Sequence, residues 1–157
     1  MRAPRGAQPE VVYKTIAHSR TSATIDGMAD KLKVLIVEDD MLMGTLLSEA
    51  LWRYEFEPIL AKDGDEGLKT LEKTLPHLVL LDLILPGING FEVLERIKSN
   101  ARTKDIPVII VSNLGDKSDI ERGLSLGAED YLVKANMVPK DIVGKIQDVV
   151  KKFNLKH

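Results

Sequence analysis

Short apolar runs, each followed at once by a polar residue, constrain the fold of this chain more than any other feature of its sequence. Residues 34–37 precede three consecutive acids, residues 78–81 precede Asp82, and residues 107–111 precede Ser112. A strand that is apolar on both faces belongs to a parallel sheet that helices cover on both sides. The runs therefore predict an α/β fold whose polar groups gather at the carboxyl ends of parallel strands.

Helical periodicity fills the segments between these runs. In residues 41–54, for example, apolar side chains recur at helical spacing through Leu42, Leu46 and Ala50. The chain is thus predicted to alternate five strands with five helices. The expected strands are residues 34–37, 58–61, 78–81, 107–111 and 131–133, and the expected helices are residues 41–54, 64–75, 91–99, 116–126 and 139–153.

The composition excludes several classes of protein. The 157 residues include no cysteine, which rules out thiolate metal sites and thiol catalysis. The formal net charge of −2 gives no indication of a nucleic-acid surface. The apolar runs are far too short to span a bilayer, and no signal-peptide run is present. We therefore expect a cytoplasmic protein that contacts neither nucleic acid nor membrane.

The first 30 residues differ from the rest of the chain. They combine prolines, glycines and scattered serines and threonines with little apolar periodicity. We expect a disordered tail over residues 1–30 and one folded domain over residues 31–155. A transit peptide would have a similar mildly basic composition, and Met28 is an alternative start residue. Residues 1–27 are expected to be dispensable for stability.

Acidic, hydroxyl and basic side chains are expected to converge at one edge of the sheet. They are Glu38 and Asp39 after the first strand, Asp82 after the third, Ser112 at the end of the fourth and Lys134 after the fifth. Carboxylates brought together need a proton or a cation between them, and an oxygen-only ligand set suits Mg²⁺. A carboxylate in this setting can form an aspartyl phosphate, while a lysine and a hydroxyl hold the other phosphate oxygens. Each residue alone has an ordinary structural reading, so the prediction depends on their combination.

Four stretches of the sequence resemble the receiver domain of bacterial two-component response regulators. They are residues 34–40, 80–90, 107–112 and 127–134. The distances along the chain from Asp82 to Ser112 and from Ser112 to Lys134 are those of the family. The resemblance implies a flavodoxin-like, doubly wound, five-stranded parallel sheet with strand order 2-1-3-4-5 and helices on both faces.

The resemblance also assigns roles to individual residues. It implies that Asp82 accepts the phosphoryl group. It implies that Asp39 and Asp82 ligate Mg²⁺, that Glu38 assists through water, and that Ile84 contributes its backbone carbonyl. Asp40 is then a bystander that is expected to cap the first helix.

Three further residues complete the set that the resemblance implies. Lys134 is the phosphate-binding cation, Ser112 the switch hydroxyl and Tyr131 the switch aromatic residue. Phosphorylation is expected to draw Ser112 toward the phosphoryl group, so that the Tyr131 ring fills the vacated space from outside.

One position departs from the family pattern. The family usually has proline, in a cis bond, after its lysine, whereas Ala135 follows Lys134 here. A cis bond without proline costs about 2.5–4 kcal/mol. We nevertheless expect a cis bond at this position, because Lys134 must still reach the phosphoryl site.

Three other readings of the sequence compete with this one. A haloacid-dehalogenase-type phosphatase needs an acid two residues after its nucleophile, where this chain has Ile84, and a cap domain. A flavodoxin-type electron carrier needs a phosphate loop rich in serine and threonine after the first strand, where this chain has acids. A pseudo-receiver that serves only as a docking module would not need Asp82 and Lys134.

The resemblance finally implies how the protein signals. We expect a single-domain response regulator that receives its phosphoryl group from a sensor histidine kinase or a histidine phosphotransfer protein. Apart from weak self-phosphorylation and self-dephosphorylation it is not an enzyme, and it is expected to be a monomer or a weak dimer. Its output should act on a protein target through the fourth helix, the fifth strand and the fifth helix. Ile120, Leu124, Tyr131 and the helix after Pro139 form this face.

Overall fold

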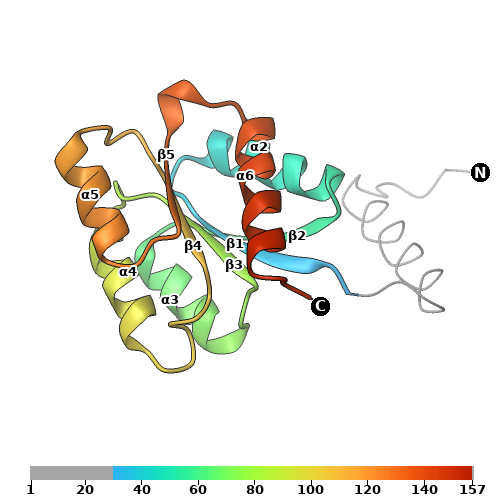
Figure 1. The fold of residues 1–157 in the computed structure, drawn as a ribbon, viewed down its shortest axis with the longest axis horizontal. Helices are drawn as coiled ribbons and strands as arrows, with labels where there is room; N and C mark the ends of the chain where they lie inside the picture. The colour runs from blue at the N-terminus through green and yellow to red at the C-terminus, as the bar shows by residue number, and fades with distance from the viewer. Residues whose placement is uncertain (1–29, 157) are drawn as a thin grey trace, which may run out of the picture. The chain divides into compact units, whose positions relative to one another are not determined.

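A computed structural model describes residues 30–156 of the chain. The predictions for residues 1–27 and for Met28 lie outside these described residues. Element labels follow Figure 1, in which the first labelled helix is α2.

Five parallel strands form a single sheet with the order β2-β1-β3-β4-β5, as the resemblance implied. The register aligns the carboxyl ends of neighbouring strands, because Val37 pairs with Leu81 and Ser112 pairs with Val133. The strands are β1 (Leu32–Val37), β2 (Phe56–Ala61), β3 (Leu78–Leu81), β4 (Val108–Ser112) and β5 (Asp130–Val133).

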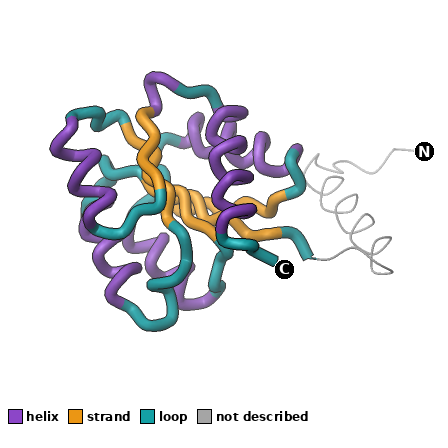
Figure 2. Tube along the Cα trace, in the orientation of Figure 1, coloured by secondary structure: helices purple, strands orange, loops and turns teal. Residues whose placement is uncertain are grey.

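Helices cover both faces of this sheet, and the strands form a central layer between them (Figures 1 and 2). The helices are α2 (Met41–Arg53), α3 (Gly64–Lys73), α4 (Gly90–Ser99), α5 (Lys117–Ser125) and α6 (Pro139–Lys152), with a short 3₁₀ turn, η1, at Lys134–Asn136. Side chains of α2 and α6 join one buried apolar cluster, and those of α3 and α4 join the other. Strand residues alternate between the two clusters: Val34 and Ile36 enter the first, and Leu35 and Val37 the second. The predicted doubly wound α/β fold is confirmed.

Side-chain caps fix where three of the helices begin. Asp40 accepts hydrogen bonds from the backbone N–H groups of Leu42 and Met43 at 2.9 and 3.1 Å, which confirms its expected role at the start of α2. Asp63 and Asn89 cap α3 and α4 in the same way. These caps satisfy N–H groups that would otherwise have no partner in the first turn. They hold the starts of α2, α3 and α4 close to the carboxyl ends of β1, β2 and β3.

Helix α5 is attached to the sheet far more sparingly than its neighbour α4. Gly123 is the only fully buried residue of α5, whereas α4 buries five of its ten residues. Ile120 is partly buried and Leu124 is exposed. The cap residue of α5, Asp116, makes no side-chain hydrogen bond to the helix. Helix α5 is therefore held by one fully buried glycine, the partly buried Ile120 and the contact of Arg122 with the Phe91 ring.

Candidate functional site

Three carboxylates meet at the carboxyl edge of the sheet, as the sequence predicts. Glu38 and Asp39 follow β1, and Asp82 follows β3. One carboxylate oxygen from each of the three lies within 4.8 Å of the others. Glu38 and Asp82 are buried, with 4% and 5% of their surface exposed, whereas Asp39 faces solvent. Two of the three acids are therefore removed from water, so they need either a proton or a nearby positive charge.

Lys134 supplies that positive charge. Its Nζ lies 2.7 Å from Oε2 of Glu38 and 2.8 Å from Oδ2 of Asp82, and its side chain is buried. Burial disfavours the charged lysine, but hydrogen bonds to Asp82 and Glu38 outweigh that effect and raise the pKa of Lys134. Burial also raises the pKa of Glu38 above its ordinary value of 4.5, although the hydrogen bond from Lys134 acts in the opposite direction. The lysine is thus a charged bridge between two strand ends.

Backbone groups hold both buried carboxylates in place. The N–H of Asp40 donates to Oε1 of Glu38 at 3.1 Å, and the N–H of Ile84 donates to Oδ1 of Asp82 at 3.2 Å. Each buried acid therefore accepts one bond from the backbone of its own loop and one from Lys134. This arrangement leaves the exposed Asp39 without a competing cation among the described ion pairs.

Gly90 lies directly beneath the acceptor loop. A Cβ on this residue would come within 2.3 Å of the backbone oxygen of Asp82 and 2.5 Å of the Cα of Leu83. Only glycine permits this approach, because neither backbone atom can retreat as a flexible side chain would. Residues 86–90 have the proline- and glycine-rich composition of a loop, which gives no sign that the last glycine supports Asp82.

Ser112 and Tyr131 are joined through the backbone of Leu114. Ser112 is completely buried, and its Oγ accepts a hydrogen bond from the N–H of Leu114 at 3.3 Å. The hydroxyl of Tyr131 donates to the carbonyl oxygen of the same residue. Burial, reinforced by nearby carboxylates of which Asp119 is the foremost, raises the pKa of the Tyr131 phenol.

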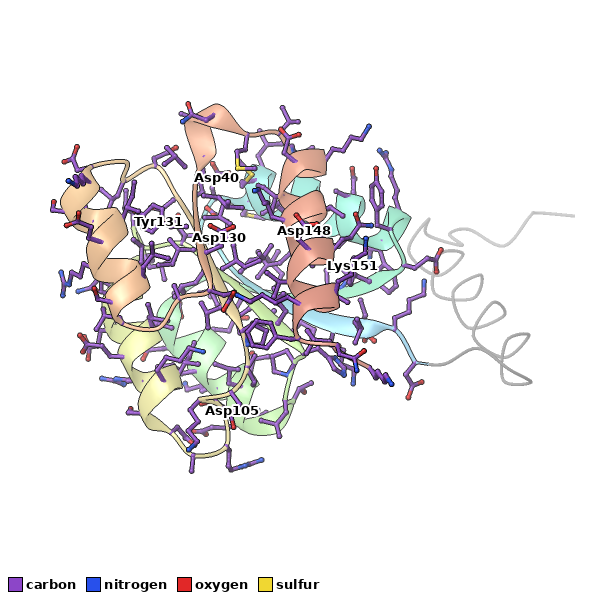
Figure 3. All side chains as sticks on the ribbon, in the orientation of Figure 1. Asp40, Asp105, Asp130, Tyr131, Asp148 and Lys151 are labelled. Carbon is purple, nitrogen blue, oxygen red and sulfur yellow. The ribbon has the colours of Figure 1, made fainter. Side chains whose placement is uncertain are left out.

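The Tyr131 ring already occupies a buried place, with 9% of the residue exposed, on the side of β5 that faces α5 (Figure 3). The sequence-based expectation had this ring enter from outside after Ser112 moved. In this structure the ring is inside while Ser112 still bonds to Leu114. Residue spacing alone does not determine a side-chain rotamer, so the sequence could not show this.

The expected cis bond between Lys134 and Ala135 is wrong. None of the peptide bonds in residues 30–156 is cis. Lys134 instead begins the 3₁₀ turn η1, and its long side chain reaches Asp82 from there. A trans bond thus places the lysine at the acceptor carboxylate without the cost of a cis bond.

Two apolar residues, Ile84 and Leu114, stand two positions after Asp82 and Ser112, and they differ in exposure. Ile84 is 53% exposed, and Leu114 is half-buried against the core cluster that contains Tyr131. Neither side chain can donate or accept a hydrogen bond. Neither can therefore orient a water molecule beside Asp82.

Comparison with known proteins shows what class of protein this fold and site define. Residues 34–147 match the response regulator receiver domain family, and the chain belongs to that family. It is therefore a phosphoacceptor signalling domain of the two-component phosphorelay type, a class that implies a histidine kinase partner. The resemblance found in the sequence is confirmed, and membership of this family excludes the phosphatase and flavodoxin readings.

Curated relatives extend well beyond the part that matches. The phosphate regulon transcriptional regulatory protein PhoB of Escherichia coli is 34% identical over 122 residues, which cover 78% of this chain and 53% of PhoB. PhoB of Klebsiella pneumoniae is equally similar over the same shares of the two chains. The chain thus spans about half the length of the curated relatives it matches.

Solved structures of receiver domains superpose on this fold. A putative response regulator from Chloroflexus aurantiacus is 30% identical with a TM-score of 0.72, and the match covers 77% of this chain and 98% of that protein. The Mn²⁺-bound form of response regulator Rcp1 is 31% identical with a TM-score of 0.66, over 75% of this chain and 91% of Rcp1.

The residues present fit a divalent metal ion of the magnesium type. Their donors are carboxylate oxygens close enough together to share one ion, and hard cations such as Mg²⁺ prefer such ligands.

No helix within residues 30–156 has the length and apolar character that crossing a membrane requires.

Proposed function

We propose that this receiver domain accepts a phosphoryl group on Asp82 when Mg²⁺ is bound by Glu38, Asp39, Asp82 and the backbone carbonyl of Ile84. The observation that carries the proposal is the meeting of three carboxylates with one buried lysine at the end of the sheet. Receiver family membership supports the same assignment.

The proposed reaction is a transfer between two nucleophiles. An oxygen of the Asp82 carboxylate attacks the phosphorus, the bond from phosphorus to the donor's imidazole nitrogen breaks, and that nitrogen keeps the electron pair. When bound, Mg²⁺ would neutralise negative charge on the phosphoryl oxygens. Lys134 contacts Asp82 already and can turn the same ammonium group to a phosphoryl oxygen. The hydroxyl of Ser112 is the donor proposed for another oxygen.

The phosphodonor is proposed to be a histidine kinase or a histidine phosphotransfer protein. Exposed apolar side chains lie in or beside the three loops that carry the site: Met41 (82% exposed), Leu42 (69%), Ile84 (53%) and Val138 (58%). A partner that covers them would exclude water from the transfer while gaining apolar contact area. This rim supports a protein donor, since a small phosphodonor could not cover it.

Output is proposed to pass to a protein target through the face formed by α5, β5 and α6. Ser112 would leave the N–H of Leu114 to bond the phosphoryl group, and the loop before α5 would then rearrange. Such a change shifts an existing equilibrium rather than building a new fold. Amide chemical shifts around Ile120 and Leu124 should therefore change on addition of beryllofluoride and Mg²⁺.

Incubation with acetyl phosphate and Mg²⁺, followed by intact-protein mass spectrometry, tests the acceptor assignment. The wild-type protein should gain one phosphoryl group, and Asp82→Asn should gain none. The matched control is Asp40→Asn, because asparagine caps a helix as well as aspartate does and the Asp40 carboxylate bonds to the first turn of α2. Phosphorylation that persists in Asp82→Asn, or that is absent from both wild type and control, would refute the assignment.

A further inference from the structure

A glycine in the last turn of α5, Gly123, lies against the buried Tyr131 ring. A Cβ on Gly123 would come within 3.1 and 3.3 Å of Cδ2 and Cε2 of Tyr131, and within 2.5 Å of Cδ1 of Ile110. Gly123 is also the only fully buried residue of α5. The helix therefore contacts the sheet most closely at the point where the aromatic ring lies.

The ring cannot easily yield to a larger residue at position 123. Its Cα is fixed in β5, where Tyr131 pairs with Ile110 of β4. Its far end is fixed by the hydrogen bond from the hydroxyl to the carbonyl oxygen of Leu114. The terminal methyl of Ile110 can rotate away, but a planar ring held at both ends can move only by giving up one of its attachments.

We propose that Gly123 is the positioning residue that keeps the Tyr131 ring inside the domain before any phosphorylation, and that it couples the ring to the position of α5. The inward ring fits only while α5 carries no side chain at this point. A residue with a Cβ would force the ring outward or lift the helix from the sheet. In either case the α5–β5 surface would change although Asp82 and its neighbours stay as they are.

Helix propensity does not explain this glycine. Glycine is less favourable than alanine in a helix interior, so an unconstrained position would gain stability from alanine. The chain provides such a position in Gly144 of α6, where a Cβ would meet nothing within 4 Å. Gly123 and Gly144 can therefore be compared as helical glycines, one with a ring against it and the other with open space.

The signalling consequence of this inference rests on the proposed phosphorylation switch. The packing of Gly123 against the Tyr131 ring does not depend on phosphorylation. In the wild-type protein without phosphodonor, nuclear Overhauser contacts should link the Tyr131 ring protons to the Gly123 α-protons and the Ile110 δ-methyl. Their absence would overturn the proposal without any variant.

Gly123→Ala should weaken the Tyr131–Ile110 contact, shift the α5 amide resonances and lower the pKa of the Tyr131 phenol, which burial raises in the wild type. The phenol is followed with ¹³C-labelled tyrosine. Gly144→Ala should leave these signals unchanged and raise the melting temperature by roughly 2–4 °C. Unchanged Tyr131 signals in Gly123→Ala would overturn the proposal.

The Tyr131→Ala background separates a ring clash from general damage to α5. Gly123→Ala should lower the melting temperature of the wild-type protein, but should be neutral or stabilising once the ring is absent. An equal loss in both backgrounds would show that the ring does not require the glycine.

A phosphorylation assay distinguishes failure of this inference from failure of the proposed function. Gly123→Ala should still gain a phosphoryl group from acetyl phosphate and Mg²⁺, because position 123 lies outside the acceptor site. A wild-type protein that is never phosphorylated would refute the proposed function and leave the packing result intact.

Discussion

Replacing Lys134 by methionine should expose how much the acceptor site depends on a single positive charge. Methionine preserves most of the apolar stem and removes the ammonium group that bridges Glu38 and Asp82 at 2.7 and 2.8 Å. Both carboxylates then remain buried beside each other with no cation between them. Removing one partner of a buried ion pair typically costs about 3–5 kcal/mol.

Protonation of Glu38 limits how much unfolding free energy Lys134→Met can lose through this residue. Its carboxyl can take up a proton, and holding that proton at pH 7 against the ordinary pKa of 4.5 costs at most about 3.4 kcal/mol. The expected loss of unfolding free energy at pH 7 is therefore about 3 kcal/mol. A typical domain has an unfolding free energy of roughly 5–15 kcal/mol, so this loss is a large share of it.

The loss should depend on pH in a defined direction. Burial raises the pKa of Glu38 in the folded wild type, and without Lys134 this pKa should rise further. The folded state then binds a proton more tightly than the unfolded state, so stability falls as the pH rises from about 4.5 through the folded pKa. The difference between Lys134→Met and wild type should thus be smaller at pH 5 than at pH 7, by up to about 2.7 kcal/mol.

Urea denaturation measures these differences, with wild type and variant compared at each pH in EDTA and in excess Mg²⁺. Magnesium at a hundredfold excess over its dissociation constant should restore about 2.7 kcal/mol if the ion takes the place of the lost charge. Lys152→Met is the matched control, because the Lys152 side chain is 67% exposed in its ion pair with Glu129 and should contribute at most about 1 kcal/mol. A Lys134→Met protein as stable as wild type in EDTA at pH 7 would refute this account of the site.

Two further outcomes concern the approach to Asp82 and the loop beneath it. Ile84→Asn and Leu114→Glu, singly or together, should speed loss of the phosphoryl group by up to about 10²–10⁴-fold, because polar side chains can position the attacking water. Decay followed by mass spectrometry checks this, and an unchanged rate would show that these side chains do not set the lifetime. Gly90→Ala should lower the unfolding free energy by about 1–3 kcal/mol, because its Cβ would strike the backbone of Asp82 and Leu83. Gly115→Ala, whose Cβ would make only ordinary contacts, is the control in the same denaturation experiment, and equal losses would contradict the explanation.

The fold could be predicted because its signals are local. Apolar runs bounded by polar residues located all five strands, and the caps Asp40 and Asn89 fix helix starts within a residue of those expected. Differences arose where the pattern is weak. Strand β2 begins at Phe56, whereas the sequence predicted residue 58. The prediction missed this start because Glu57 and Pro58 interrupt the apolar pattern of this edge strand.

The site was predictable only as far as strand order brings residues together. The sequence placed Glu38, Asp82 and Lys134 at one edge, and the structure brings them into contact. It could not show that Lys134 lies as close to Glu38 as to Asp82, nor that the bond after Lys134 is trans. These features depend on side-chain torsions and on a 3₁₀ turn of three residues, neither of which leaves a periodic signal.

The sparse attachment of α5 implies that stability is distributed unevenly over the domain. A helix that buries one residue loses little apolar contact when it separates from the sheet, whereas α4 would have to expose five buried residues. Local opening of α5 should therefore cost much less free energy than global unfolding. A target protein, or a change in the loop at Leu114, needs only modest interaction energy to displace this helix while the sheet that holds Asp82 stays folded.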